Sequence, residues 1–192
     1  MFVVAGPAGS GKTTAFPPHG FGTDFFSVDD RCAQLNSGLY TGIGPELRAR
    51  IGAECRSFIE QHIADGVSFA VETTLRTDVA IRQAEAANAA GFTTFLFVLA
   101  TEDVRLSIKR IARRGQMGGH ASPEADIRAI FAASMANLPR AVAVFSHVEC
   151  FDNSQHGAIR VRVLAFDHGS VIYRADPLPA WAASLVSSDA PT

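Results

Sequence analysis

The sequence predicts a three-layer α/β/α domain with a mainly parallel, five-stranded sheet and a β-hairpin added at the C-terminal end. Three observations support this fold class. Short apolar runs alternate with longer amphipathic segments, which indicates crossover connections between parallel strands. A glycine-rich segment follows the first apolar run directly. The length of 192 residues suits one domain with a full hydrophobic core.

The predicted strands are short apolar runs, and the predicted helices are segments with a helical period. The strands span residues 2–5, 25–28, 67–71, 94–100 and 148–151. The helices span residues 45–65, 78–90, 102–114 and 123–138. In the first helix, Leu47, Ile51 and Cys55 begin a series of apolar residues spaced by three and four, the period of one helix face.

The C-terminal part of the chain has a different pattern. Residues 159–174 alternate in hydrophobicity, and Asp167-His168-Gly169-Ser170 supplies a turn within them. This pattern predicts a β-hairpin at the edge of the sheet. The absence of low-complexity linkers favours a single domain over residues 1–192, with residues 159–174 as its extension.

Composition restricts the class of protein. Hydrophobic residues make up 47% of the chain, charged residues 19%, and the net charge is −2. A soluble globular domain is therefore expected, without non-specific nucleic-acid binding. No segment approaches the roughly 20 apolar residues of a membrane span. Cys32, Cys55 and Cys150 lack metal-site spacing, which favours free thiols in a reducing, cytoplasmic location.

A phosphate-binding loop is predicted between the first strand and the following helix. Gly6-Pro7-Ala8-Gly9-Ser10-Gly11-Lys12-Thr13 has the glycine spacing and the Lys-Thr pair of the P-loop motif. Its glycines let backbone N–H groups surround phosphate, and lysine reaches the β- and γ-phosphates. The threonine hydroxyl suits a Mg²⁺ shell. The predicted ligands are ATP and Mg²⁺, with Thr13 on the metal, and the fold narrows to a P-loop NTPase of the kinase-like type. The nucleotide-binding residues are Gly6, Pro7, Ala8, Gly9, Ser10, Gly11, Lys12, Thr13 and Thr14.

Two carboxylates follow predicted strands and are candidates for chemistry. Asp29 comes just after the second strand, where a kinase needs a base for the attacking hydroxyl. Asp30 is its neighbour, and the alternative is that both acids only cap the next helix. Glu72, followed by Thr73, lies at the end of the third strand. If that strand lies beside the first, Glu72 would reach the metal or the substrate; the alternative is an ordinary charged strand end.

The helix over residues 102–114 has a cationic face. Arg105, Lys109 and Arg113 are four residues apart, with Arg110 and Arg114 offset by one. Like charges at this spacing repel one another unless an anion is near, and ATP phosphates are the expected anion. Arg113 is the first candidate for phosphate binding and Arg110 the second. The alternative is a solvated helix face.

Two further segments are weaker candidates. The glycine-rich residues 115–122 lie between two helices and suit a lid, in which His120 is expected to contact substrate or phosphate. A loop histidine is also often merely exposed. Asn153 follows the fifth strand and would contact adenine or ribose, or else form an Asx turn.

Together these motifs resemble the zeta-toxin-like P-loop kinases, from about Phe2 to Trp181. The matching segments after the P-loop are Val28-Asp29-Asp30, Val71-Glu72-Thr73-Thr74-Leu75-Arg76, Arg110 to Arg114 with Gly118-Gly119-His120, Ser134-Met135-Ala136-Asn137-Leu138, and Phe151-Asp152-Asn153-Ser154. The resemblance implies a kinase fold and transfer of phosphate to a small-molecule hydroxyl, on UDP-N-acetylglucosamine in characterised members. It also implies an antitoxin protein as a partner.

The resemblance extends to roles of individual residues. It places the family's catalytic aspartate at Asp29 and an active-site glutamate at Glu72. Asp29, Glu72 and the adjacent Thr73 are the candidates for substrate binding. It also implies that an arginine of the 102–114 helix, Arg113 or Arg110, stabilises the transferring phosphoryl group.

The chain departs from this pattern in one helix and in one loop. Related sequences often place arginines around an aromatic residue where this chain has Ala129-Ile130-Phe131-Ala132-Ala133, which leaves only Arg128. Because the P-loop is intact, the departure bears on the identity of the substrate more than on ATP binding. A kinase for another metabolite, or an ATP-binding regulatory or toxin protein with little turnover, are therefore alternatives. In addition, Pro17-Pro18 should limit the first helix to about one turn.

Overall fold

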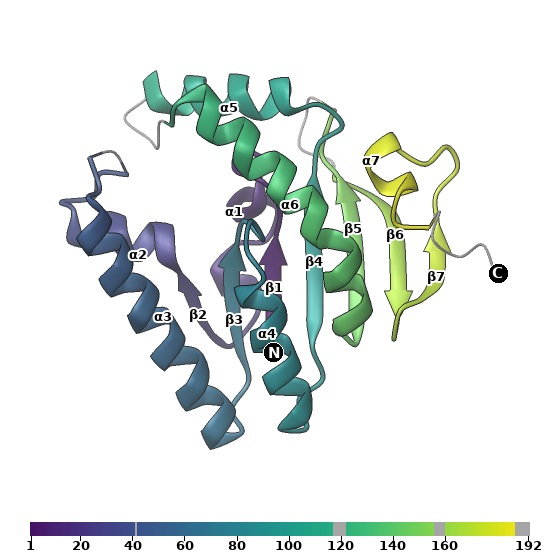
Figure 1. Ribbon diagram of the computed structural model, residues 1–192, viewed down its shortest axis with the longest axis horizontal. Coiled ribbons are helices and arrows are strands. Elements are labelled where there is room, and N and C mark those ends of the chain that lie inside the picture. The colour runs from purple at the N-terminus through teal and green to yellow at the C-terminus, as the bar shows by residue number, and fades with distance from the viewer. Residues whose placement is uncertain (41, 117–121, 156–159, 187–192) are drawn as a thin grey trace.

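Within the described residues, one seven-stranded sheet forms the centre of the molecule, in the order β2-β3-β1-β4-β5-β6-β7 (Figure 1). The structure is a computed structural model that describes residues 1–40, 42–116, 122–155 and 160–186. The strands are β1 (Phe2–Ala5), β2 (Asp24–Ser27), β3 (Phe69–Thr73), β4 (Phe95–Ala100), β5 (His147–Asp152), β6 (Val161–Asp167) and β7 (Ser170–Arg174). The first five are parallel, which confirms the predicted mainly parallel sheet.

The topology places a crevice at the carboxyl end of β1. Strands β3 and β4 follow each other in the chain, yet they pair with opposite edges of β1. Val3 of β1 aligns with Val71 on one side and with Leu96 on the other. In open parallel sheets, such a switch of direction leaves space for a ligand beyond the strand ends. The glycine-rich loop leaves β1 at this point.

The helices largely follow the predicted bounds. They are α1 (Lys12–Ala15), α2 (Val28–Leu35), α3 (Pro45–Asp65), α4 (Val79–Ala89), α5 (Val104–Gln116), α6 (Glu124–Val144) and α7 (Ala180–Ala183), with a 3-10 turn η1 (Pro18–Gly20). The predicted end of α6 at Leu138 is wrong, because the helix continues through Pro139 to Val144. Leu138, Ala141 and Val142 are buried, so their packing outweighs the one bond that proline cannot donate.

One face of the sheet carries the main hydrophobic core. Helices α3, α4 and α6 lie in front of the sheet in Figure 1. Ile59 of α3, Ile81 of α4 and Leu138 of α6 belong to the same buried cluster as Val3 and Val71 of the sheet. Their burial removes most of their apolar surface from water, which is the main favourable term in folding.

The opposite face is covered by aromatic rings. Helix α1 has only four residues and is followed by η1, which confirms the predicted short first helix. Phe16 packs on Phe97 at a ring-centroid distance of 5.2 Å, and Phe21 packs on Phe2 at 5.8 Å. The guanidinium of Arg160 lies 4.6 Å from the centre of the Phe16 ring, a cation–π contact. These side chains cover the part of the sheet that a longer first helix would otherwise cover.

The predicted C-terminal hairpin is present as β6 and β7. Strand β6 pairs antiparallel with β5, and β7 pairs antiparallel with β6. His168 and Gly169 at the tip have positive φ angles of 46° and 77°, as a two-residue hairpin turn of type I′ requires. The hairpin extends the sheet at the edge away from β2.

The cysteines are free, as predicted. Burial raises the pKa of Cys150 to about 12 and that of Cys55 to about 11, so both thiols stay protonated near neutral pH. Among the described residues, only α6 has the length and apolar composition of a membrane span, contrary to the expectation that no segment would approach one. Core helices share that composition, and Leu138, Ala141 and Val142 of α6 pack in the core of this fold.

Candidate active site

A cavity of about 1240 Å³ lies at the carboxyl ends of the parallel strands. Its walls come from the P-loop, the start of α2, the middle of α3, the segment that joins β3 to α4, and the first half of α6. The cavity brings together four residues that the sequence analysis selected from separate parts of the chain: Lys12, Asp29, Glu72 and Arg110.

At Gly6 and Gly11 the P-loop backbone has a shape that strongly favours glycine. Gly6 has a φ of +147°, and a Cβ atom there would lie 2.0 Å from the carbonyl oxygen of Leu99. Gly11 has a φ of +96°, and a Cβ atom there would lie 2.5 Å from Nδ2 of Asn153. Both glycines are therefore required by positive φ and by close neighbours, which gives the sequence motif a structural reason.

Lys12 points back over the loop. It is 7% exposed, and its Nζ donates hydrogen bonds to the carbonyl oxygens of Gly6 (2.9 Å) and Pro7 (3.3 Å). The same Nζ lies 3.7 Å from Oε1 of Glu72, and Thr13 Oγ1 donates a hydrogen bond to Oε2 of Glu72 at 3.1 Å. Because β3 pairs with β1, the Glu72 carboxylate lies beside both the lysine and the threonine of the motif.

The Asn153 side chain holds the P-loop in place through a hydrogen bond. Its Nδ2 donates to the carbonyl oxygen of Ser10 at 2.7 Å, and its own carbonyl oxygen accepts from Nη2 of Arg110 at 2.8 Å. The amide is therefore engaged with the loop, whereas the sequence suggested an adenine contact or an Asx turn. The sequence analysis missed this role because the contact joins residues 143 positions apart.

Two buried donors beside the loop have open hydrogen-bonding capacity. In the part of the chain that the structure describes, Ser10 Oγ and Arg110 Nη1 have no hydrogen-bond partner. Burial lowers the pKa of Arg110, and nearby Asp152 partly opposes this effect. A guanidinium stays charged in proteins, so the half-buried guanidinium of Arg110, whose buried Nη1 has no partner among the described residues, is suited to an anion. The cradle thus fits phosphate oxygens.

The two aspartates at the start of α2 face the cavity. The N-cap of the helix is Ser27, whose Oγ accepts from the backbone N–H of Asp30 at 3.3 Å. The carboxylates have other partners: Asp29 lies 3.4 Å from Nη1 of Arg48, and Asp30 accepts from the Tyr40 hydroxyl at 2.8 Å. Ser27 is thus the N-cap, both acids lie in the first turn of the helix, and both line the cavity.

The basic face of α5 lies mostly outside the cavity. Arg105, Lys109 and Arg113 are exposed, and none of them is among the lining residues. Arg110 lines the cavity, so the geometry reverses the predicted preference for Arg113. The exposed residues are solvated because α5 turns only one edge toward the P-loop. The predicted contact by His120 lies outside the described residues.

The rest of the cavity wall contains residues that the sequence analysis gave no role. Arg48 and Arg56 of α3, with Thr74 and Arg76 after β3, line it together with apolar residues of α6. In the sequence, only Thr74 and Arg76 stood out, because they belong to the motif at the end of β3. Long-range packing of α3 and α6 creates this wall, and no local pattern encodes it.

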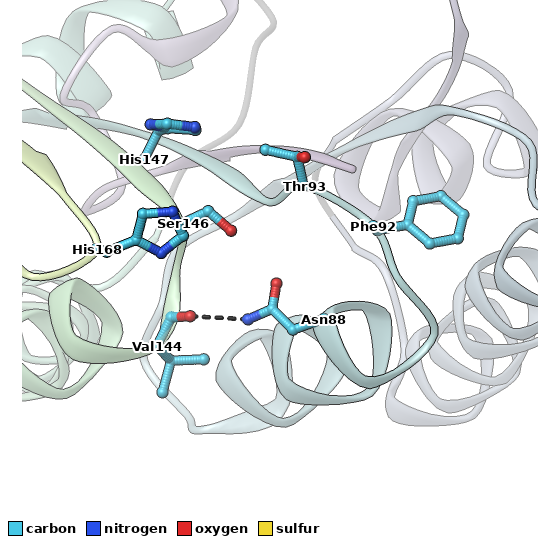
Figure 2. Close-up of a pocket in the computed structure, with 7 residues that line it drawn as sticks. All are labelled: Asn88, Phe92, Thr93, Val144, Ser146, His147 and His168. Carbon is cyan, nitrogen blue, oxygen red and sulfur yellow. Dashed lines mark hydrogen bonds between the residues drawn. The ribbon is translucent and has the colours of Figure 1, made fainter.

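A second, smaller cavity of about 430 Å³ lies at the amino ends of β4 and β5 (Figure 2). Asn88 donates to the carbonyl oxygen of Val144 at 2.8 Å, as the dashed line in Figure 2 marks, and accepts from Thr94 Oγ1 at 2.9 Å. His147 lies 2.8 Å from an oxygen of Asp167. The described residues form no group of three or more potential metal ligands here or elsewhere.

A P-loop at the end of β1, with carboxylates supplied by β3 and α2, places the protein in the class of P-loop kinase-like folds. The chain belongs to the zeta toxin family, whose model matches residues 50–181. The match begins after the P-loop. Family membership therefore rests on other parts of the chain and is independent evidence beside the loop geometry.

Solved structures with a similar fold include a complex with ATP, a toxin–antitoxin system and a candidate kinase. AvrRxo1-ORF1 in complex with AvrRxo1-ORF2 and ATP aligns with a TM-score of 0.66 and 16% identity over 88% of this chain. The PezAT toxin–antitoxin system of Streptococcus pneumoniae aligns with a TM-score of 0.56 and 19% identity over 83% of this chain and 71% of that one. A candidate kinase from Chloroflexus aurantiacus aligns with a TM-score of 0.54 and 20% identity over 67% of this chain and 76% of that one.

At these identities the likeness shows the shared fold. This chain covers 59% of the AvrRxo1 chain that it matches. No curated protein matched the sequence.

Proposed function

We propose that the protein is an ATP-dependent phosphotransferase that phosphorylates a hydroxyl group of a small molecule. The observation that carries this proposal is the convergence of Lys12, Thr13 and Glu72 at the P-loop, with Asp29 lining the same cavity. The first three are the groups that a nucleoside triphosphate and its metal require. Asp29 supplies a carboxylate for the hydroxyl that attacks.

The P-loop residues 6–14 would hold the triphosphate of ATP. Lys12 would exchange its bonds to the Gly6 and Pro7 carbonyl oxygens for bonds to the β- and γ-phosphates. Arg110, with its open Nη1, is the preferred second cation on phosphate, and Arg113 is a weaker candidate because its side chain is exposed. Thr13 and Glu72, hydrogen-bonded to each other, would hold Mg²⁺ through the threonine oxygen, with the carboxylate nearby. When bound, the metal neutralises charge on the phosphates.

Asp29 would act as the general base. Its carboxylate accepts the proton of the acceptor hydroxyl while the acceptor oxygen bonds to the γ-phosphorus. The bond from that phosphorus to the β–γ bridging oxygen breaks, and ADP leaves. Arg48, 3.4 Å from Asp29, orients the carboxylate toward the cavity. Glu72, Thr73 and the segment after them would contact the acceptor, and a contact from His120 stays a prediction.

UDP-N-acetylglucosamine is the first acceptor to test, because the chain belongs to the zeta toxin family. We propose an antitoxin protein as partner and a cytoplasmic location on the same basis. A kinase for another hydroxylated metabolite is the second candidate. Ala129 and Ala133 favour it, because these small apolar residues line the cavity within the segment where the resemblance leads us to expect arginines.

A screen with γ-labelled ATP tests the proposal. Purified protein is incubated with Mg²⁺, labelled ATP and one acceptor at a time: UDP-N-acetylglucosamine, nucleosides, aminoglycosides and simple sugars. The expected result is label transfer to at least one acceptor, abolished in Asp29→Asn. ATP binding without transfer to any acceptor would instead favour a nucleotide-binding regulatory protein. Growth arrest in bacteria that express the wild-type protein, and normal growth in bacteria that express Lys12→Ala, would indicate that the protein is a toxin.

A further inference from the structure

The chain makes an unusual bend directly after β3. Leu75 has a φ of +59°, a left-handed conformation that leucine rarely adopts, yet its side chain is 1% exposed and belongs to the core. Its neighbours Thr74 and Arg76 both line the large cavity. We call Thr73 to Thr77 the acceptor loop. The bend buries Leu75 while the residues on either side of it face the cavity.

Side chains hold this bend in place. Within the loop, Thr73 Oγ1 accepts from the backbone N–H of Leu75 at 3.1 Å. From α6, Asn137 Nδ2 donates to the carbonyl oxygen of Leu75 at 2.9 Å, and Ser134 Oγ lies 2.5 Å from the carbonyl oxygen of Thr74. Ser134 also lies 2.7 Å from the carbonyl oxygen of Ile130 in its own helix, so its single hydrogen is shared between two carbonyls.

The helix that holds the loop also lines the cavity beside it. Ile130 and Ala133 of α6 line the cavity, and Ser134 and Asn137 follow them on the same helix. Ser134 is 1% exposed, so its hydroxyl has no access to water as a substitute partner. The two bonds to consecutive carbonyls therefore fix the distance between the α6 wall and the side chains of Thr74 and Arg76.

We infer that Ser134 and Asn137 are positioning residues that hold the acceptor loop in its left-handed bend, and so set the shape of the acceptor end of the active site. This inference rests on the proposed function. Backbone strain of this kind persists only where surrounding contacts impose it, and it gathers at ligand-binding sites. Neither residue touches the P-loop in any bond described above, so their effect should be confined to the acceptor.

Asn137→Asp tests the inference with almost no change in side-chain shape. Aspartate keeps the size of asparagine but cannot donate to the Leu75 carbonyl. Asn88→Asp is the matched control, because Asn88 makes the same kind of bond, to Val144, at the other end of the sheet (Figure 2). With the acceptor found in the labelled-ATP screen, we expect Asn137→Asp to raise the acceptor KM by about tenfold. The KM for ATP should stay within twofold in both variants.

Ser134→Ala should act in the same direction, and a second measurement does not depend on turnover. Hydrogen–deuterium exchange over residues 73–77 should be faster by at least about tenfold in Asn137→Asp and Ser134→Ala, and unchanged in Asn88→Asp. Acceptor kinetics equal to those of Asn88→Asp, or unchanged exchange in this segment, would overturn the inference. A wild type that phosphorylates no acceptor would count against the proposed function, while exchange would still decide whether the two side chains hold the loop.

Discussion

The cavity at the carboxyl ends of the parallel strands and the cavity at their amino ends are both lined by polar side chains, but they differ in how those side chains are used. At the amino end, Asn88 bonds to Val144 and Thr94, and His147 pairs with Asp167. At the carboxyl end, Arg110 keeps an open N–H, and Lys12 bonds to carbonyl oxygens that phosphate could replace.

This difference follows from the direction of the chain. Parallel strands bring their carboxyl ends, and the loops after them, to one edge of the sheet. The P-loop after β1, the aspartates after β2 and the acceptor loop at the end of β3 all lie at that edge. At the amino end, loops return to the sheet and their polar groups complete the fold. Substitutions at the carboxyl end should therefore change ATP binding or turnover, whereas substitutions at the amino end should leave both unchanged.

The largest effect is expected from Lys12→Ala. Removal of the ammonium group should abolish detectable ATP binding, measured by calorimetry, together with phosphoryl transfer. Lys109→Ala is the matched control, because Lys109 is the other lysine in the sequence and is exposed. Retained ATP affinity in Lys12→Ala would mean that the P-loop has been misinterpreted.

Asp29→Asn should separate catalysis from binding. The amide cannot accept the acceptor proton, so turnover should fall by about 10² or more while ATP affinity is kept. Asp30→Asn serves as the control, since Asp30 accepts from Tyr40 in the same cavity. If the loss appears in Asp30→Asn instead, the base is the neighbouring residue. Initial rates of label transfer at saturating ATP are the measurement.

Gly11→Ala should weaken ATP binding by about tenfold. Alanine at a φ of +96° is strained by about 1–2 kcal/mol, and its Cβ would press on the Asn153 amide that supports the loop. Gly22→Ala provides the comparison: Gly22 also has a positive φ, +62°, but no atom lies within 4 Å of the added Cβ. Both variants should lose stability, and only Gly11→Ala should lose ATP affinity in a titration.

The smallest effect is expected at the amino end, from Asp167→Asn. The His147 and Asp167 side chains are 38% and 46% exposed, so solvent screens their attraction and the pair contributes at most about 1 kcal/mol. Thermal unfolding should shift only slightly, and kinetic constants for ATP and acceptor should stay unchanged. A loss of turnover here would contradict the assignment of function to the carboxyl end.

Local sequence patterns were sufficient for most of the fold. Apolar runs predicted the five parallel strands, and the period of residues 45–65 predicted α3 with its bounds, because Pro45 and Gly66 mark its ends. The end of α6 could not be predicted, since proline normally stops a helix and only burial of Ala141 and Val142 carries it further.

For the site, the sequence by itself determined the phosphate loop, because glycines at positive φ and a lysine at fixed spacing have a local physical reason. It also selected Asp29 and Glu72, whose place follows from the ends of neighbouring parallel strands. Only the tertiary structure placed Arg110, and not Arg113, on the wall of the cavity. It also brought the Asn153 amide to the Ser10 carbonyl oxygen and joined Ser134 and Asn137 to the acceptor loop. These contacts depend on how α5 and α6 pack against the sheet, and packing between distant segments leaves no periodic trace in the sequence.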